Sequence, residues 1–411
     1  MEVNTLKVLI QWAGGFDTPG PSNHLLKALI EDMTASGISV HLVQGSIKKV
    51  NEEMPSELKE LDGFTYDTLQ RKDIAKSNFI RRYLEEIIYA IRSYRYWKKV
   101  DDLDIVFVRS CPTSLYAILL AKIFLRKPVL YGIQDMFPGS AVNSGVIRNK
   151  IIANIFYYLQ KIAYKKSDAI TVISEDMKTK VIEQGVSEDK IFPIVNWFDD
   201  RSVHEVAWKE NRFVKKYNLS KDNFYVQYAG TMGYVFDYKM VLDVAELLKE
   251  YKDIKFQMIG QGSQKDAFMK EKENRGLNNI AFYPLEPQDM VSDVYSTCSI
   301  CLIPLKKGII GNSVPSKAGL LMACNRTIVN SVDEGSDYYR IFHENEMGIS
   351  ASNDNPKEVA EAILDLYNDS EKRKQMAKNG HEFGDQYYSR SVNTKKFIEI
   401  GRASCRERVS T

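Results

Sequence analysis

The residues best suited to chemistry lie in three glycine-bearing loops, each expected between a strand and a helix. These loops span residues 12–15, 230–233 and 260–263, and they contain Gly14, Gly15, Gly230, Thr231, Gly233 and Gly262. Glycine lets a ligand approach the backbone, and a helix N-terminus offers unpaired N–H groups to an anion. The last two loops follow expected neighbouring strands, so together they predict a diphosphate site. None reads GxGxxG, which disfavours a nicotinamide- or flavin-dependent oxidoreductase.

A lysine at a helix start could complete such a site. Lys317 falls in the first turn of an expected helix, which Pro315 and Ser316 are suited to begin. A cation at this position opposes the helix dipole unless an anion binds there. Lys317 is therefore a candidate phosphate ligand, and a solvated surface lysine is the alternative.

Two acidic loops also follow expected strands. The loop at 333–337 includes Glu334, Gly335 and Ser336. It could hydrogen-bond sugar hydroxyls or only cap a helix. Asp135 follows a strand in the first half and is a candidate at the cleft, with a turn aspartate before a proline as the alternative.

Composition narrows the class of protein. The chain has 411 residues, of which 44% are hydrophobic and 27% are charged. This balance is typical of a globular protein and excludes a disordered or collagen-like chain. The net charge of +2 gives no argument for nucleic-acid binding. Five cysteines are too few for a disulfide framework, and neither zinc-ligand spacing nor a Ser-His-Asp or HExxH pattern is present, so no metal site is expected.

Short β-rich runs alternate with helical patterns along the chain. Strands are expected at 7–11, 40–44, 105–109, 129–133, 169–173, 191–195, 224–229, 255–259, 280–283, 300–304 and 327–331. This alternation predicts parallel sheets with helices on both faces. A charged stretch at 196–220 interrupts the rhythm and is interpreted as an inter-domain linker. The predicted fold is α/β, with two doubly wound domains that face a cleft.

Several of these segments carry a family likeness. SDAITVISE at 167–175, followed by Gly185 and NWFD at 196–199, resembles the inter-domain region of GT-B glycosyltransferases of the family-4 group. YAGTMG at 228–233, MIGQG at 258–262 and VPSK at 314–317 resemble the donor-binding loops of that family. YGIQDMFP at 131–138 is similar to a segment of the members that build bacterial surface polysaccharides. The likeness runs in order through nearly the whole chain.

The resemblance implies two Rossmann-like domains and a metal-independent, retaining sugar transfer without a cofactor. It implies an N-terminal acceptor-side domain at 1–200, a nucleotide-sugar-binding domain at 201–375, and helices at 376–400 that pack back toward the first domain. It implies that Gly230, Thr231, Gly233, Pro315, Ser316 and Lys317 approach the nucleotide and phosphates. Glu334 and its neighbours would approach the sugar or nucleotide, and Asp135 would face the acceptor. The expected acceptor is a glycan or a lipid-linked sugar of capsule or O-antigen type.

The chain departs from the family pattern at three points. Two glutamates of the family correspond to Asn312 and Leu320, and an arginine of its first donor loop corresponds to Thr231. The usual Ala-x-Gly reads Ala323-Cys324-Asn325. These departures leave open an alternative, which is a catalytically inactive or partner-dependent nucleotide-sugar-binding protein of the same fold.

Two basic segments suggest where an acceptor could be met. Residues 79–100 carry six basic residues and many aromatic ones, and residues 148–166 carry five basic residues and no acidic one. Basic amphipathic helices with aromatic residues suit an anionic membrane surface, although lysines and arginines that extend from core helices are the alternative. A peripheral contact at the inner face of the membrane is therefore one expectation.

The ends of the chain complete the expectations. Residues 1–12 lack the basic start and apolar centre of a signal peptide, and the apolar stretch 115–125 is too short to span a bilayer. A cytoplasmic location is expected. Residues 401–411 have no apolar face and no turn signals, and we interpret them as a non-native tail; a basic disordered tail is the alternative.

Overall fold

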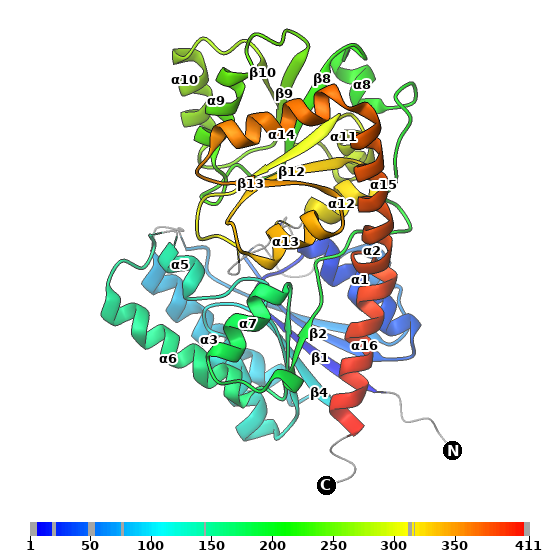
Figure 1. Cartoon of the computed structure of the whole chain (residues 1–411). Helices are drawn as coiled ribbons and strands as arrows, with labels where there is room; N and C mark the ends of the chain where they lie inside the picture. The colour runs from blue at the N-terminus through cyan, green and yellow to red at the C-terminus, as the bar shows by residue number, and fades with distance from the viewer. Residues whose placement is uncertain are drawn as a thin grey trace. The chain divides into compact units, whose positions relative to one another are not determined.

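The computed structural model describes residues 6–18, 22–47, 54–74, 78–143, 145–310, 315 and 317–406. The chain divides into two compact units (Figure 1). Unit 1 holds the described residues up to Val195 and from Asn393 onward, and unit 2 is Asn196–Val392. The sequence-based boundary at 200 lies a few residues later. Within the described ranges, no helix combines the length and the apolar character needed to cross a bilayer.

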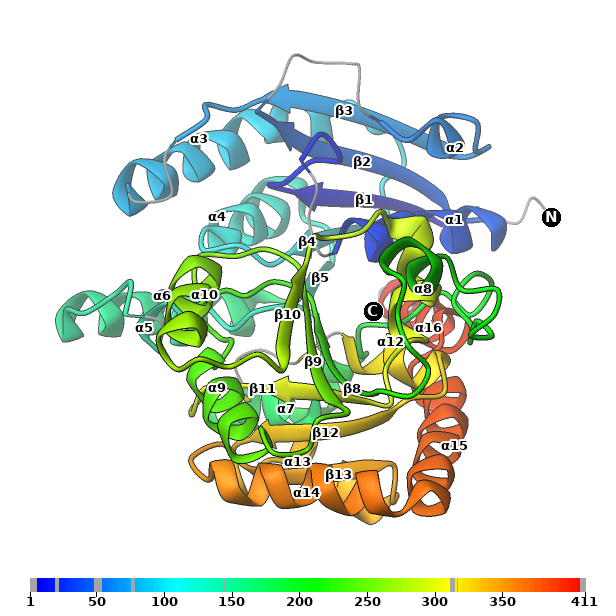
Figure 2. The same cartoon turned by 90° about the horizontal axis from the view of Figure 1, so that it is seen from above.

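Unit 1 is built on a parallel sheet of seven strands among the described residues, in the order β3-β2-β1-β4-β5-β6-β7. The strands are β1 (Lys7–Trp12), β2 (Ser39–Ser46), β3 (Phe64–Gln70), β4 (Ile105–Arg109), β5 (Val129–Gly132), β6 (Ala169–Val172) and β7 (Ile191–Pro193). Figure 2 shows β1, β2 and β3 lying side by side. The strand order reverses between β1 and β4, which is where doubly wound sheets bind ligands.

Helices cover both faces of this sheet. They are α1 (Asn23–Ala35), α2 (Ser56–Lys59), α3 (Phe79–Trp97), α4 (Ser114–Leu119), the π-helical turn η1 (Leu120–Leu125), α5 (Gly139–Asn143), α6 (Lys150–Lys166), α7 (Glu175–Glu183), η2 (Glu188–Lys190) and α16 (Arg390–Arg406). The side chain of Gln11 bonds Ser93 and Trp97 of α3. Side chains alternate along a strand, so the next residue, Trp12, lies on the opposite face.

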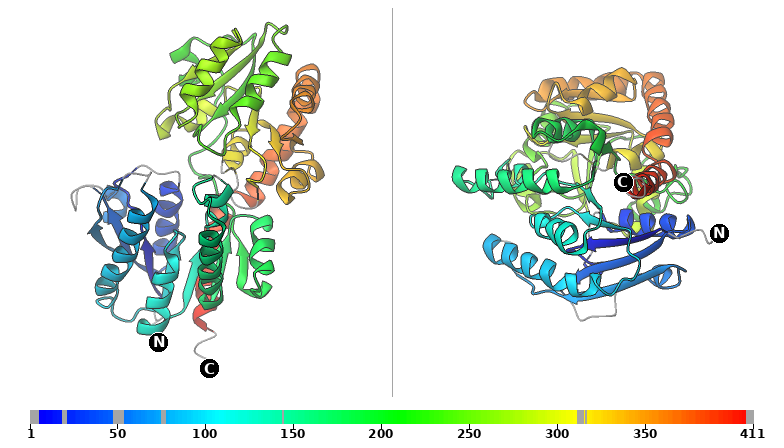
Figure 3. Two further views of the ribbon diagram at one scale, coloured as in Figure 1. Left: turned by 90° about the vertical axis from the view of Figure 1, so that its left-hand side faces the viewer. Right: turned by 90° about the horizontal axis from the view of Figure 1, so that it is seen from below.

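The last helix completes the core of unit 1. Phe397 of α16 is buried and meets Phe107 of β4 with ring centroids 4.8 Å apart. Thr394 donates to Asp32 of α1 at 2.9 Å. Elements from the two ends of the chain, β1 and α16, therefore belong to the same unit (Figure 3). The described part of the expected tail continues α16 as far as Arg406.

Unit 2 repeats the pattern with a six-stranded parallel sheet within the described residues, ordered β10-β9-β8-β11-β12-β13. The strands are β8 (Phe224–Ala229), β9 (Ile254–Ile259), β10 (Ile280–Tyr283), β11 (Ile300–Pro304), β12 (Thr327–Val332) and β13 (Gly348–Ser352). The central strands β8, β11 and β12 are buried along their whole length, as expected for a sheet covered on both faces. The predicted α/β fold class is thus confirmed in both units.

The helices of unit 2 begin before its first strand. They are α8 (Arg212–Tyr217), α9 (Tyr238–Leu247), α10 (Lys265–Asn274), η3 (Gln288–Met290), α11 (Val291–Tyr295), α12 (Lys317–Ala323), α13 (Asp337–Glu344), α14 (Pro356–Asn368) and α15 (Ser370–Tyr387). The chain enters and leaves this unit at adjacent points. Phe198 pairs with Ser389, and Asp199 forms an ion pair with Arg390 at 3.3 Å.

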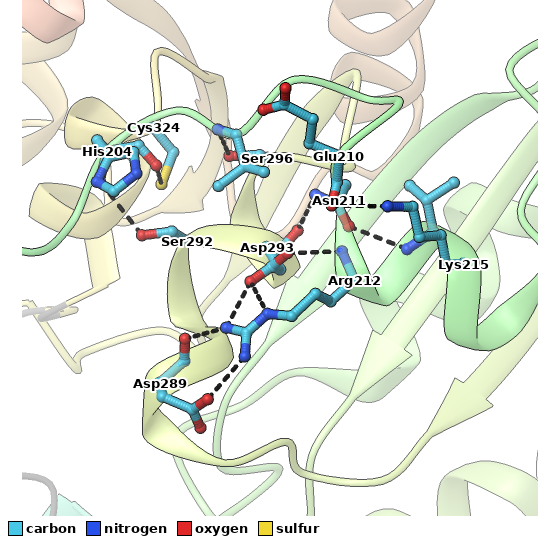
Figure 4. Close-up of polar contacts among 12 residues, drawn as sticks. His204, Glu210, Asn211, Arg212, Lys215, Asp289, Ser292, Asp293, Ser296 and Cys324 are labelled. Atoms are coloured by element: carbon cyan, nitrogen blue, oxygen red, sulfur yellow. Dashed lines mark hydrogen bonds and ion pairs between the residues drawn. The ribbon is translucent and has the colours of Figure 1, made fainter.

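The interpretation of 196–220 as a linker is wrong, because this segment packs into unit 2. Phe213 of α8 is fully buried. Asn211, also fully buried, donates to the Asp293 carbonyl at 2.7 Å and accepts from the Val214 N–H at 2.9 Å. Arg212 binds the Asp293 carboxylate at 2.8 Å (Figure 4). The many charges that suggested a linker serve to attach α8 to α11.

Candidate functional site

The candidate site of unit 2 lies at the carboxyl ends of its strands. The loop at 230–233 follows β8 and the loop at 260–263 follows β9. Strand order reverses between β8 and β11, so the first of these loops lies at the switch point of the sheet. The two predicted glycine loops are therefore adjacent, because β8 and β9 pair along their whole length.

The two loops are packed so closely that glycine is required. A Cβ added to Gly260 would collide with the Gly230 carbonyl, and one added to Gly262 would collide with the Met232 carbonyl. Both glycines also have positive φ angles, of 134° and 157°. Any side chain here would push the two loops apart, so the glycines keep the backbones of the two loops in direct contact.

Hydrogen bonds between the loops determine which backbone donors remain. The N–H groups of Gly230 and Met232 donate to the carbonyls of Ile259 and Gln261, at 2.9 and 2.8 Å. Among the described residues, the N–H groups of Thr231 and Gly233 have no acceptor. The hydroxyl of Tyr228 donates to the Thr231 carbonyl at 2.8 Å and so orients this loop.

Gln264 holds the far end of the first loop. Its amide nitrogen donates to the carbonyls of Gly233 and Phe236, the latter at 2.9 Å. Its amide oxygen accepts from Lys306 Nζ at 3.1 Å. These bonds fix the loop in place before any ligand binds.

Lys317, at the start of α12, is the unusual residue of the site. Its Nζ lies 3.3 Å from the ring centroid of Tyr228. The Nζ atom is buried and has no hydrogen-bond acceptor, and a Cβ on Gly230 would stand 3.0 Å from it. Burial lowers the pKa of Lys317 to about 7. A buried amine without a partner costs stability, so an anion at the first glycine loop would offset that cost.

The acidic loop after β12 has a partly structural role. Asp333 accepts from the N–H of Gly308 at 2.8 Å and so orders the loop that follows β11. Ser336 caps α13 by accepting from the Tyr339 N–H at 3.1 Å. Glu334 and Gly335 are exposed. The capping alternative thus applies to Ser336, whereas Glu334 remains available to a ligand.

The other residues predicted for the site are divided between unit 1 and unit 2. Pro315 is half-buried before α12, and Ser316 lies outside the described residues. Gly14 and Gly15 follow β1 in unit 1 and line a pocket of about 390 Å³. Asp135, exposed after β5, also belongs to unit 1. Among the described side chains, no cluster of His, Cys, Asp or Glu could hold a metal ion.

Sequence reasoning missed three residues that shape these sites. Tyr228 lies beneath the Lys317 amine, Gln264 clamps the first loop, and Arg109 stacks on Trp12 beside the glycines of unit 1. Only Arg109 had a signal in the sequence, because it is a charged residue that ends the otherwise apolar run IVFVR.

Family comparisons agree with the two-unit architecture. Residues 22–201 match the family described as "Glycosyltransferase Family 4", and residues 209–383 match "Glycosyl transferases group 1". The chain belongs to the family-4 group of GT-B glycosyltransferases. In this family-4 chain the two matched segments correspond closely to the two units, and the loops at 230–233 and 260–263 lie in the second.

Relatives of this family-4 chain include WbjE of Pseudomonas aeruginosa, named as a probable glycosyltransferase, at 25% identity over 57% of this chain and 58% of WbjE. WcaI of Escherichia coli (strain K12), named for colanic acid biosynthesis, is 24% identical over 57% of this chain and 58% of WcaI. The chain therefore matches less than two thirds of the length of either relative. The structure of Anabaena HepE in complex with UDP shares the fold with a TM-score of 0.72, at 12% identity over 97% of this chain and all of HepE (100%).

Proposed function

We propose that this protein is a retaining glycosyltransferase that uses a nucleotide-diphosphate sugar to extend a polysaccharide or lipid-linked acceptor for the cell surface. The observation that carries the proposal is the buried, unpartnered amine of Lys317 beside Gly230. A departing nucleoside diphosphate develops negative charge, and preorganised positive groups and N–H donors stabilise such charge. The free N–H groups of Thr231 and Gly233 lie in the same loop as Gly230.

Metal independence is part of the proposal. In many phosphoryl and glycosyl sites a metal ion supplies the positive charge that the leaving diphosphate needs. Here Lys317 would supply that charge, with the ammonium formed as the diphosphate binds. Retention of configuration is proposed from family membership. The relatives support the substrate classes, since HepE is described with UDP and WcaI is named for colanic acid biosynthesis.

Turnover with a panel of UDP- and GDP-sugars tests the reaction. The purified protein is incubated with each donor and a bacterial membrane extract, with and without EDTA, and the anomeric configuration of the product is read by NMR. We expect one donor to be consumed, retention at the anomeric carbon, and no effect of EDTA. The proposal would be contradicted if none of the donors were hydrolysed or used for transfer, or if turnover required added metal.

A pair of lysine variants locates the site. Lys317→Met should weaken donor binding by about 10- to 100-fold, because a charge-assisted hydrogen bond to phosphate is lost. Lys307→Met is the matched control, since Lys307 is an exposed lysine that pairs with Asp354 at 3.1 Å. Calorimetric titration with UDP should show a loss of affinity only in the first variant. Equal affinities in both variants would remove Lys317 from the site.

An alternative function follows from a specific residue. Leu320 occupies a position where many family members have a glutamate, and in this structure it packs against the core of unit 2. A chain without that carboxylate could bind a nucleotide sugar without transferring it, or transfer it only with a partner protein. UDP binding by calorimetry combined with no turnover of any donor would favour this alternative.

We also propose that unit 1 contacts the membrane that carries the acceptor. Ile80, Leu84, Ile88 and Ile91 form one exposed stripe along α3, with Ile80 72% exposed. On α6, Ile151, Ile155 and Tyr158 are exposed in the same spacing. The two helices touch, because the ring of Phe156 lies 5.2 Å from that of Tyr83.

The charges around these stripes favour an anionic bilayer. Helix α3 contains two acidic residues, Glu85 and Glu86, and both are buried at 6% and 7% exposure. Helix α6 contains none. The exposed residues of the two helices are isoleucines, a leucine, tyrosines, Asn154 and basic side chains such as Arg81 and Lys161, and none of them is acidic. Apolar insertion combined with cationic attraction is the pattern of an interfacial helix.

Vesicle sedimentation tests this contact. We expect binding to phosphatidylglycerol vesicles, little binding to phosphatidylcholine vesicles, and release at high salt. Ile151→Asp combined with Ile155→Asp should weaken binding by at least about tenfold, because each buried isoleucine contributes roughly 1.5–3 kcal/mol. Leu285→Asp, at a 62% exposed leucine of unit 2, is the control and should bind normally. Undiminished binding of the double variant would disprove the contact.

A further inference from the structure

Gln264, the residue that precedes α10, contacts the backbone of the first glycine loop and of the turn after it. Its own N–H donates to the Met232 carbonyl at 3.0 Å. Its side-chain amide donates to the carbonyl of Gly233, and to that of Phe236 at 2.9 Å. A single residue therefore holds three carbonyl groups of the segment 232–236.

The planarity of the peptide bond converts these contacts into an orientation of N–H groups. In a trans peptide the C=O and the N–H point in opposite directions. The Met232 carbonyl shares its peptide with the Gly233 N–H, and the Gly233 carbonyl shares its peptide with the Tyr234 N–H. Because both carbonyls point toward Gln264, both N–H groups point away from it.

The N–H groups that Gln264 orients are available to a ligand. Among the described residues, those of Gly233 and Tyr234 donate to no acceptor. Tyr234 is 67% exposed, so a ligand can reach this side of the loop. Successive N–H groups that point to the same side attract an anion. The bonds of Gln264 thus prepare two donors for a negatively charged group.

Lys306 determines which way the Gln264 amide faces. Its Nζ donates to Gln264 Oε1 at 3.1 Å. An ammonium group has donors and no acceptor, so only the amide oxygen can face it. The NH2 end of the amide must then face the carbonyls of Gly233 and Phe236. Among the described residues Lys306 forms no ion pair, so no carboxylate competes for its ammonium.

The backbone places Lys306 beside the same turn. Lys306 lies just after β11, and its N–H donates to the Val235 carbonyl at 3.0 Å. The residue before it, Leu305, pairs with Phe236. The first glycine loop follows β8, and Gln264 lies between β9 and α10. Segments that follow three different strands therefore meet at one side-chain amide.

We propose that Gln264 and Lys306 are positioning residues of the donor site. Lys306 holds the Gln264 amide, and Gln264 directs the N–H groups of Gly233 and Tyr234 toward the diphosphate of the sugar donor. Donors that are already oriented need no reorganisation when the charge of the diphosphate arrives. This inference rests on the proposed function for the identity of the ligand, whereas the order of the empty loop can be measured without any ligand.

A double-mutant cycle tests this arrangement by calorimetric titration with UDP, or with GDP if the protein binds that nucleotide. Lys306→Met should weaken binding about fivefold, and Gln264→Met by at least about tenfold, because hydrogen bonds that hold the loop are lost. The double variant should bind no more weakly than Gln264→Met, since Lys306 acts only through Gln264. A further loss of affinity in the double variant, or unchanged affinity in either single variant, would overturn the proposal.

Two further variants complete the titration. Lys307→Met is the matched control, because the neighbouring exposed lysine pairs with Asp354, and it should bind like the wild type. Lys306→Arg keeps a cation that can only donate to the amide oxygen, so it should restore binding to within about twofold of the wild type. An Lys306→Arg variant as weak as Lys306→Met would contradict the role of the charged donor.

Hydrogen exchange of the protein without nucleotide separates positioning from a general loss of stability. In Lys306→Met and Gln264→Met, peptides that contain residues 230–236 should exchange faster, whereas peptides of α14 should be unchanged. Equal acceleration throughout unit 2 would indicate a purely structural role and overturn the proposal. This measurement uses no donor, so it decides the order of the loop even if the wild type binds no nucleotide. That last result would contradict the proposed function instead.

Discussion

The Nζ atom of Lys317 and the side chain of Arg109 are both buried, and neither residue forms an ion pair among the described residues. An unpaired buried charge costs folding free energy, so a protein keeps one where a ligand of opposite charge restores the balance. Arg109 ends β4, and Lys317 begins the helix that follows β11. Both strands border the switch points of their sheets. For Lys317, this placement supports the role proposed for it at the donor site.

The ionisation of Lys317 gives a prediction at the residue scale. Its pKa of about 7 lies below the ordinary value of 10.5, because burial penalises the ammonium. Below about pH 7 both the folded and unfolded chains carry the proton, and the full cost of burial is present. As pH rises from 7 toward 10.5, only the unfolded chain keeps the proton, so the stability of the empty protein should increase. Unfolding of Lys317→Met should lack this increase.

Donor binding should reverse that ionisation. A diphosphate favours the ammonium, so binding at about pH 8 should take up close to one proton. Calorimetric titrations in two buffers of different ionisation enthalpy measure this uptake directly. Lys317→Met should give the same heat in both buffers. A wild-type heat that is independent of buffer would rule out the coupling.

Lys317 could be predicted from the sequence, whereas its contact with Tyr228 could not. A lysine in the first turn of a helix conflicts with the helix dipole, and that conflict is visible in one short segment. The contact of Lys317 with Tyr228 joins residues 89 positions apart (317 minus 228). Such pairs form only when the sheet brings distant strands together, so no local pattern reveals them.

At the scale of elements, the interlocked loops after β8 and β9 give a second prediction. Gly262→Ala should lower the free energy of unfolding of unit 2. The strain of a positive φ alone costs about 1–3 kcal/mol, and the clash with the Met232 carbonyl adds to that cost. The substitution should also weaken UDP binding, because the first loop must move. Chemical denaturation and calorimetry measure the two effects.

A second glycine provides the control for that prediction. Gly276 also has a positive φ, of 63°, but an added Cβ would meet no atom within 4 Å. Gly276→Ala should therefore show the strain alone, about 1 kcal/mol, and normal UDP binding. If the two variants behaved alike, the close packing of the loops would not matter for the site.

Every strand expected from the sequence is present, with ends shifted by at most two residues, but β3 and β13 were missed. Both are edge strands. β3 carries Thr and Asp on partly exposed positions, and β13 is rich in small residues, so neither has the apolar run of a central strand. The interpretation of 196–220 as a linker was wrong for a similar reason. In the sequence, the charged residues whose ion pairs attach α8 cannot be distinguished from solvent-exposed charges.

At the scale of the whole molecule, unit 1 is made from both ends of the chain. Phe397→Ala should destabilise unit 1 by about 3–5 kcal/mol, since a buried ring that meets Phe107 is removed. Hydrogen exchange measured by mass spectrometry should be faster in peptides of unit 1 and unchanged in peptides of unit 2. Phe383→Ala, in α15, should show the opposite distribution.

The assignment of α16 to unit 1 was beyond local sequence reasoning. Its apolar stripe is weak, and only packing against β4 and α1 reveals which sheet it covers. The sequence indicated helices after 376 that return to the first domain. The structure places α15 in unit 2 and the part of α16 from Asn393 in unit 1.

The pairing of Phe198 with Ser389 also bears on how such chains could be recombined. Because the Phe198 N–H donates to the Tyr388 carbonyl at 3.0 Å, the entrance and the exit of unit 2 are neighbours. A segment whose ends are adjacent can be exchanged without stretching the chain that hosts it. Residues 196–392 thus form a natural cassette. A chimera that carries the equivalent segment of a relative should keep the acceptor preference of the host and take the donor preference of the insert.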